Sequence, residues 1–254
     1  MTSAVPRPFL ILKMGSTLPS LRDRRGDFED WVARGAGLSA SETRVVDVLA
    51  EPALPPLDGA AGVIVTGSHT MVTERQPWSE RAAQWLCGAV SGGVPVLGIC
   101  YGHQLLAHAH GGEVADNPHG REFGTVQIEL DAAGRVDALL GVLPAAFAAH
   151  EGHTQSVLRL PPGAVRLAAN AWDAAQALRI GERAWGVQFH PEFDADIIRE
   201  YVDHYRGLLA AQGQDPDALI RAAEDNPLGA RILSRFADLC RSWKSPRDGQ
   251  AAGP

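Results

Sequence analysis

Two short segments, each at the end of an apolar run, most constrain what this chain can fold into. GICYGHQ at positions 98–104 follows the apolar residues 94–97, and GVQFHPE at 186–192 continues the apolar run 184–187. Apolar runs of this length are typical of buried strands. A thiol at one strand end, and an imidazole with a carboxylate two residues later at the other, indicate a catalytic triad rather than a packing motif.

The glycines on either side of Cys100 predict a tight turn from strand to helix, a nucleophile elbow. Gly98 and Gly102 leave room for the strained backbone that such a turn needs at Cys100. The turn is expected to place the sulfur at a helix N-terminus, where free N–H groups and the helix dipole favour thiolate over thiol. Cys87 and Cys240 lie in predicted helices and fit the commoner role of a small buried residue.

The second segment supplies a base and an orienting acid. His190 precedes Pro191, and the residue before a proline is pushed toward extended geometry, so the imidazole is expected to stay at the strand tip. Glu192 is close enough to bond one ring nitrogen and leave the other to accept the Cys100 proton. The three side chains therefore predict a Cys-His-Glu triad.

Together the two motifs resemble the class I (triad) glutamine amidotransferase family, including the glutaminase domain of GMP synthetase. VIVTGS at 63–68 resembles the family's strand that ends in an oxyanion loop, and REFG at 121–124 resembles a stretch common in GMP synthetase-like members. HTQ at 153–155 lies where the family often has His-Gly-Asp. The resemblance covers roughly residues 8–206, and the two outer motifs are specific when they occur in this order.

This resemblance implies hydrolysis of a γ-glutamyl amide through a thioester on Cys100, with His190 as acid and base and Glu192 as its orienter. It implies that the backbone amides of Ser68 and Tyr101 hold the oxyanion. The residues that it implies for substrate binding are Gly67, Gln104 and His153.

The sequence departs from the family pattern at two places. Ser68-His69 replaces the usual Gly-Pro, which predicts a differently shaped oxyanion loop with the Ser68 amide as its donor. Thr154-Gln155 replaces Gly-Asp, which removes the Asp expected to recognise the substrate amino group. Both departures argue against simple identity with a GMP synthetase glutaminase domain.

Three functions follow from these observations. The first is a free-standing amidotransferase that delivers ammonia to a separate synthetase subunit, because the chain has only two lysines and no GxxxxGK phosphate loop of its own. The second is a γ-glutamyl peptidase or hydrolase that acts on a γ-glutamyl conjugate. The third is a catalytically silent binding protein of the same fold, which the intact Cys100, His190 and Glu192 argue against.

Composition narrows the partners and the compartment. A net charge of −7 without a basic cluster argues against nucleic acid and anionic membrane surfaces. Three cysteines, an odd number without framework spacing, indicate a reducing compartment, and with no signal peptide or membrane-spanning run the cytoplasm is predicted. No cofactor is predicted. No metal is predicted either, because the histidine pairs 108/110 and 150/153 lack zinc-site spacing.

Apolar strands alternate with helical patterns in the first part of the chain, which predicts an α/β fold with a doubly wound, mostly parallel sheet flanked by helices. The expected strands are 9–14, 43–48, 62–65 and 94–99, and the clearest helix is 78–90. Residues 113–190 change to short, turn-bounded strands, which predicts a small antiparallel extension. The charged stretch 22–30 is expected to be a solvated loop, or less readily a lid over the cleft.

The C-terminal part is predicted to be helical. A helix is expected over 194–211, followed by a turn and a helical hairpin of 217–224 and 228–243. We therefore expect an amidotransferase domain over residues 1–211 and a C-terminal helical extension with a frayed tail over 212–254.

Overall fold

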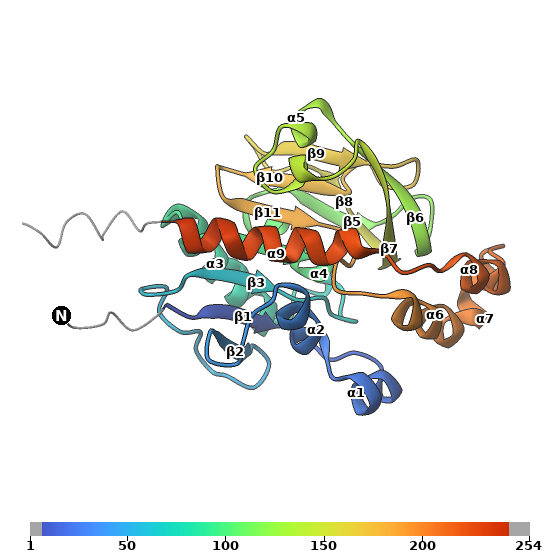
Figure 1. The fold of residues 1–254 in the computed structure, drawn as a ribbon, viewed down its shortest axis with the longest axis horizontal. Coiled ribbons are helices and arrows are strands. Elements are labelled where there is room, and N and C mark those ends of the chain that lie inside the picture. Colours follow the sequence, from blue (N-terminus) through green and yellow to red (C-terminus); the bar gives the residue numbers. More distant parts are fainter. Residues whose placement is uncertain (1–6, 244–254) are drawn as a thin grey trace, which may run out of the picture.

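A single nine-stranded sheet organises the computed structural model, which describes residues 7–243 (Figure 1). Five parallel strands lie in the order β2-β1-β3-β4-β11. Their bounds are β1 (Phe9–Lys13), β2 (Thr43–Asp47), β3 (Gly62–Val65), β4 (Val96–Ile99) and β11 (Ala184–Val187). The doubly wound α/β prediction is confirmed.

The predicted antiparallel extension continues the same sheet beyond β11, in the order β10-β9-β6-β7. These strands are β6 (Glu122–Leu130), β7 (Ala146–His153), β9 (Val165–Ala169) and β10 (Ala177–Ile180). A separate pair joins β5 (Glu113–Asp116) to β8 (Gln155–Arg159). The short segments α5 (Ala132–Arg135), η1 (Val72–Glu74) and η2 (Leu140–Val142) lie in connections.

Helices cover both faces of the parallel strands because successive side chains of a strand point to opposite sides. Leu10 and Leu12 of β1 pack with helices α3 (Pro77–Ser91) and α4 (Tyr101–Ala109). Phe9 and Ile11 pack on the other face with α2 (Phe28–Gly35) and α9 (Pro227–Ser242). The continuous apolar runs predicted as buried strands thus contribute alternate side chains to two hydrophobic clusters, one on each face of the sheet.

The expectation of a solvated loop over residues 22–30 is wrong. The segment belongs to two helices, α1 (Pro19–Arg25) and α2, joined at Gly26. Asp27 caps α2, accepts a hydrogen bond from the Thr17 amide at 2.7 Å and pairs with Lys13 Nζ at 2.8 Å. These bonds hold the charged stretch against the body of the protein, which a count of charges does not reveal.

The helix expected over 194–211 is present as two helices, α6 (Ala195–His204) and α7 (Arg206–Ala211), which meet at Tyr205. The two helices expected beyond it are also present, α8 (Pro216–Ala222) and α9. They pack mainly against other elements rather than as a hairpin: α8 lies on α6 and β6, and α9 on α2 and β7 (Figure 1). Apolar side chains of α9 complete the core, so this helix is integral to the fold.

The predicted frayed tail, residues 244–254, lies outside the described residues. Within residues 7–243, every helix is too short or too polar to span a bilayer.

Candidate active site

Cys100 stands at the junction between β4 and α4 with a left-handed backbone, φ 50° and ψ −101°. Two glycines make this turn sterically feasible. A Cβ on Gly98 would lie 2.4 Å from the Gly102 carbonyl oxygen, and one on Gly102 would lie 2.5 Å from the Val65 carbonyl oxygen. Backbone cannot yield at such distances, so only glycine fits either position. The structure therefore has the tight, strained turn from strand to helix that the sequence predicts at Cys100.

His190 follows β11, the strand next to β4, and hydrogen bonds hold both its backbone and its ring. Its backbone N–H donates to the His150 carbonyl at 2.8 Å, and its Nδ1 lies 2.8 Å from Glu192 Oε1. The Glu192 carboxylate is fully buried. Because Nδ1 is engaged by the carboxylate, Nε2 is left for the hydrogen bond to Cys100. The three predicted triad residues thus meet at one point.

Two aromatic rings fix the plane of the His190 imidazole. Phe193 stacks on it at a centroid distance of 4.0 Å and an angle of 17°, and Phe28 from α2 lies 6.4 Å away at 20°. The two phenylalanines come from segments far apart in the chain, and the stacked Phe193 restricts rotation of the imidazole.

The charge state of His190 follows from its neighbours. Burial disfavours the charged ring, but the Glu192 carboxylate and the Cys100 sulfur outweigh burial and raise the pKa of His190 to about 10. At neutral pH the imidazole is therefore protonated and can act as a proton donor. Cys100 and His190 thus present a sulfur and an imidazolium to the same cavity.

The backbone amides of Ser68 and Tyr101 are the oxyanion donors expected from the sequence. Within residues 7–243, neither N–H donates to a protein acceptor. Tyr101 is the first residue of α4, where the helix dipole favours negative charge. Gly67, expected as a substrate contact, instead faces the imidazole: a Cβ there would lie 3.1 Å from His190 Cε1.

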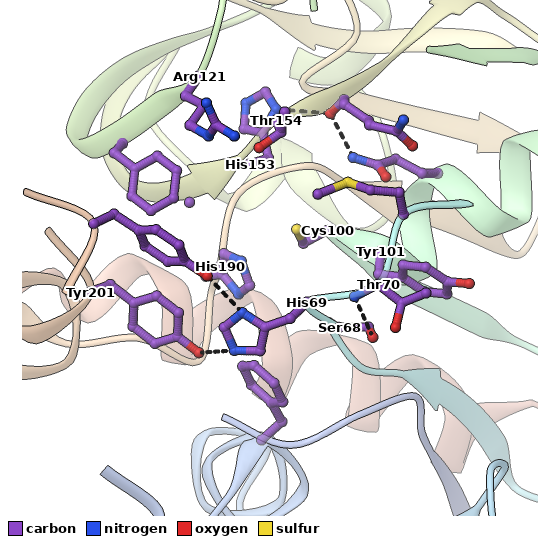
Figure 2. Close-up of a pocket in the computed structure, with 17 residues that line it drawn as sticks. Ser68, His69, Thr70, Cys100, Tyr101, Arg121, His153, Thr154, His190 and Tyr201 are labelled. Atoms are coloured by element: carbon purple, nitrogen blue, oxygen red, sulfur yellow. Dashed lines mark hydrogen bonds between the residues drawn. The ribbon is translucent and has the colours of Figure 1, made fainter. Parts of the chain in front are cut away.

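A cavity of about 100 Å³ lies over the Cys100 sulfur (Figure 2). Its walls come from the turn after β3, from α4, from the β6–β8 region and from α6. The lining residues are Phe28, Ser68, His69, Thr70, Met71, Cys100, Tyr101, Gln104, Arg121, Phe123, Gly152, His153, Thr154, Gln155, His190, Tyr201 and Tyr205. The set contains one guanidinium and no carboxylate.

Gln104 and His153 line this cavity, but both side chains also support its wall. Gln104 Nε2 donates to the Gln155 carbonyl at 2.6 Å and to Gln188 Oε1 at 3.0 Å. His153 lies between the Gln155 carbonyl at 2.9 Å and Glu122 Oε2 at 3.0 Å. These bonds hold the wall formed by Gln155 against the elbow helix.

Arg121 brings a positive charge to the cavity. Figure 2 shows its guanidinium beside Thr154 and His153, on the side of the cavity away from Ser68. No carboxylate among residues 7–243 lies within ion-pair distance of it. A guanidinium without a carboxylate partner is suited to bind a carboxylate of a ligand.

Glu122, Glu151 and His153 form a buried group whose ligand atoms lie within 4.8 Å of one another, a spacing that a metal ion could use. Glu122 accepts hydrogen bonds from His153, Asn170 and Gln176. Burial, followed by the neighbouring Glu122, raises the pKa of Glu151 well above its usual range. The hydrogen bonds to Glu122 and the burial of Glu151 give this group a structural role in the wall of the cavity.

The sequence of residues 28–200 matches the model of the glutamine amidotransferase class-I family. The chain belongs to this family. The match includes Cys100, His190 and Glu192, so the fold and the elbow agree with the family that the two motifs resemble.

Two relatives with different names are similar to the chain. A GMP synthase (glutamine-hydrolyzing) from Aeropyrum pernix is 38% identical over 167 residues, which cover 65% of this chain and 30% of that protein. A gamma-glutamyl-L-1-hydroxyisopropylamide hydrolase from a Pseudomonas species is 35% identical over 157 residues, which cover 57% of this chain and 52% of that protein. The chain thus spans from under a third to about half of the length of these relatives.

Solved structures agree on the fold. A glutamine amidotransferase from Thermotoga maritima superposes with a TM-score of 0.72 at 20% identity, and the match covers 93% of this chain and 99% of that one. A glutamine amidotransferase from Methylobacillus flagellatus gives a TM-score of 0.71 at 24% identity and covers 91% of each chain.

Sequence reasoning missed several cavity residues: Phe28, His69, Arg121, Tyr201 and Tyr205. Arg121 lies inside the REFG stretch that supported the resemblance, and this placement was the one available signal for it. Tyr201 and Tyr205 lie in the region expected to be helical, and nothing in their spacing indicates a cavity.

Proposed function

We propose that this protein hydrolyses a γ-glutamyl amide through a thioester on Cys100. The observation that carries the proposal is that Cys100 and His190 line one cavity, with His190 Nδ1 hydrogen-bonded to the buried Glu192 carboxylate at 2.8 Å. The class-I glutamine amidotransferase family supports an enzyme, and the Cys-His-Glu triad is our assignment of its catalytic machinery.

In the first half of the reaction, the Cys100 sulfur attacks the carbonyl carbon of the γ-amide. The amides of Ser68 and Tyr101 bind the oxyanion that forms, and each such donor contributes about 3 kcal/mol in related sites. His190 Nε2 then gives its proton to the leaving nitrogen as the C–N bond breaks, which releases ammonia or an amine and leaves the thioester.

In the second half, neutral His190 takes a proton from water as the hydroxide attacks the thioester. Collapse of this second intermediate breaks the C–S bond, restores the Cys100 thiolate and releases glutamate. Glu192 accepts the hydrogen bond from Nδ1 and keeps Nε2 turned toward the sulfur throughout.

The cavity supports a substrate with a free carboxylate. Arg121 is the one Lys or Arg among the lining residues. We assign it to the α-carboxylate of the γ-glutamyl group, because the reactive amide must lie at Cys100 while the other end of the glutamyl group extends away from it.

The proposed function has two forms, which differ in the group released from the γ-glutamyl amide. In an amidotransferase, ammonia from glutamine passes to a separate synthetase chain, and one component of a glutamine-hydrolyzing GMP synthase, from Ignicoccus hospitalis, is 44% identical over 99 residues. In a γ-glutamyl hydrolase, the leaving group is an organic amine, which the relative from Pseudomonas supports. We infer a cytoplasmic location for either form, because Cys87, Cys100 and Cys240 are all free.

The test is ATP-free hydrolysis by the purified chain of glutamine and of a γ-glutamyl alkylamide such as γ-glutamyl isopropylamide. Glutamate, ammonia and amine are measured, with Cys100→Ala as the inactive variant and Cys87→Ala as its matched control. Preference for glutamine favours the amidotransferase, and preference for the alkylamide favours the hydrolase. No release from either compound, with or without cell extract, would overturn the proposal in favour of a silent binding protein.

A further inference from the structure

His69 follows the oxyanion donor Ser68 and is fastened to the neighbourhood of α6. Its Nδ1 lies 3.0 Å from the Tyr205 hydroxyl, and its Nε2 lies 3.4 Å from the Tyr201 hydroxyl. The ring also stacks on Tyr201 at a centroid distance of 5.7 Å and an angle of 7°. Figure 2 shows the hydrogen bond between the imidazole of His69 and Tyr201.

These tyrosines are themselves held in place. The Tyr201 hydroxyl is hydrogen-bonded to Thr17 Oγ1 at 2.8 Å, and the Tyr201 ring packs on Phe193, the residue that stacks on His190. The Tyr205 ring packs edge-on against Phe123 of β6 at 5.2 Å. His69, itself exposed, is therefore attached to two tyrosines that make further contacts of their own.

The other side of the same turn is attached to β1. The Thr66 hydroxyl accepts a hydrogen bond from the Met14 amide at 3.0 Å and donates to the Gly67 carbonyl at 3.1 Å. Ser68 Oγ accepts from the Thr70 amide at 3.1 Å, and a Cβ on Gly15 would lie 2.8 Å from that oxygen. The turn that carries the Ser68 amide is thus held at both ends.

We propose that His69 is a positioning residue: its contacts with Tyr201 and Tyr205 hold the Ser68 amide at the oxyanion site in the isolated chain. The inference rests on the proposed function and adds a statement about its regulation. Hydrolysis in this protein does not wait for a partner protein to order the oxyanion loop. The loss of the proline expected at position 69 is compensated by side-chain contacts within the chain.

Two variants test the hydrogen bonds between His69 and the tyrosines separately from the packing of their rings. Tyr205→Phe removes one hydroxyl and keeps the ring on Phe123, and His69→Phe keeps a ring on Tyr201 but loses both hydrogen bonds. His119→Phe is the matched control, because His119 is exposed and outside the cavity. The loss of one oxyanion donor slows such reactions by about 100- to 1000-fold, so partial displacement of Ser68 is expected to lower kcat roughly 10- to 100-fold.

The measurements are kcat and KM, the melting temperature, and the rates at which Cys100 reacts with iodoacetamide and with a chloromethyl ketone analogue of glutamine. Iodoacetamide needs only the thiolate, whereas the carbonyl of the chloroketone occupies the oxyanion site. We expect both variants to lower kcat and chloroketone labelling, with KM changed less than about 2-fold and iodoacetamide labelling unchanged.

Wild-type kcat in both variants would overturn the inference. A parallel loss of iodoacetamide labelling and of the melting temperature would also overturn it, because the two contacts would then be merely structural. If the wild-type protein hydrolyses no γ-glutamyl compound, the proposed function fails by itself, and the ratio of the two labelling rates still decides the role of His69.

Discussion

Ile99 of β4 and Val187 of β11 are register partners in adjacent parallel strands. Cys100 directly follows Ile99, and its N–H donates to the Val187 carbonyl at 2.9 Å. Because the carboxyl ends of parallel strands meet at the same edge of a sheet, this pairing brings Cys100 beside His190 although the two are far apart in the chain. The backbone ladder thus fixes the positions of Cys100 and His190 relative to each other.

We expect Cys100 to be the reactive thiol of this protein. Burial raises the pKa of the Cys240 thiol, and Cys87 donates its S–H to the Ala109 carbonyl at 3.1 Å, whereas Cys100 lies at a helix N-terminus beside an imidazolium. A diazo-ketone analogue of glutamine is expected to label Cys100 stoichiometrically. Peptide mass spectrometry locates the adduct, and an adduct on Cys87 or Cys240 would refute the assignment.

The three triad residues are expected to differ in importance. Cys100→Ala and His190→Ala are expected to lower kcat by roughly 10⁶-fold, because nucleophile and base act as a unit. Glu192→Ala is expected to lower it by roughly 10⁴-fold and to leave measurable turnover, since Glu192 acts only through His190. Steady-state release of glutamate measures all three variants, and near-native turnover by His190→Ala would contradict the triad.

The protonation of His190 predicts how stability depends on pH. Its pKa is raised from 6.5 to about 10, so the imidazolium stabilises the folded state fully below pH 6.5, and this contribution is lost as the pH rises toward 10. Urea unfolding is expected to show a steeper loss of stability between these values in the wild type than in His190→Gln. NMR titration of the ring in Cys100→Ala is expected to give a lower pKa, because the sulfur contributes to the rise.

Arg121 is expected to govern affinity rather than the chemical step. Arg121→Gln removes a charge-assisted hydrogen bond to the substrate carboxylate, which is expected to raise KM by about 10- to 100-fold with little change in kcat. Arg159→Gln is the control, since Arg159 is an exposed residue paired with Glu113 outside the cavity. An unchanged KM in Arg121→Gln would remove Arg121 from the binding site.

The sequence was most informative where chemistry and backbone geometry require particular residues. The glycines around Cys100 and the proline after His190 are needed for the turn and the strand end, and these features could be read without a structure. His69 and its tyrosines could not be predicted, because their contacts join segments far apart in the chain. The charges near Asp27 were misleading for the same reason, since their partner Lys13 lies in another element.

Gly67 offers a test of how tightly the imidazole is held. A Cβ at this position would lie 3.1 Å from His190 Cε1, closer than most such contacts, so Gly67→Ala is expected to push the ring by a few tenths of an ångström. A displacement of about 1 Å can cost 100-fold in rate, and the smaller shift is expected to lower kcat roughly 10-fold.

Gly207→Ala in α7 is the matched control, because no atom lies within 4 Å of the added methyl group. Since alanine favours the helix, this control is expected to keep full activity and gain up to about 1 kcal/mol in unfolding free energy. Comparison of kcat and melting temperature for the two variants checks the prediction. Full activity in Gly67→Ala would show that the imidazole tolerates this displacement.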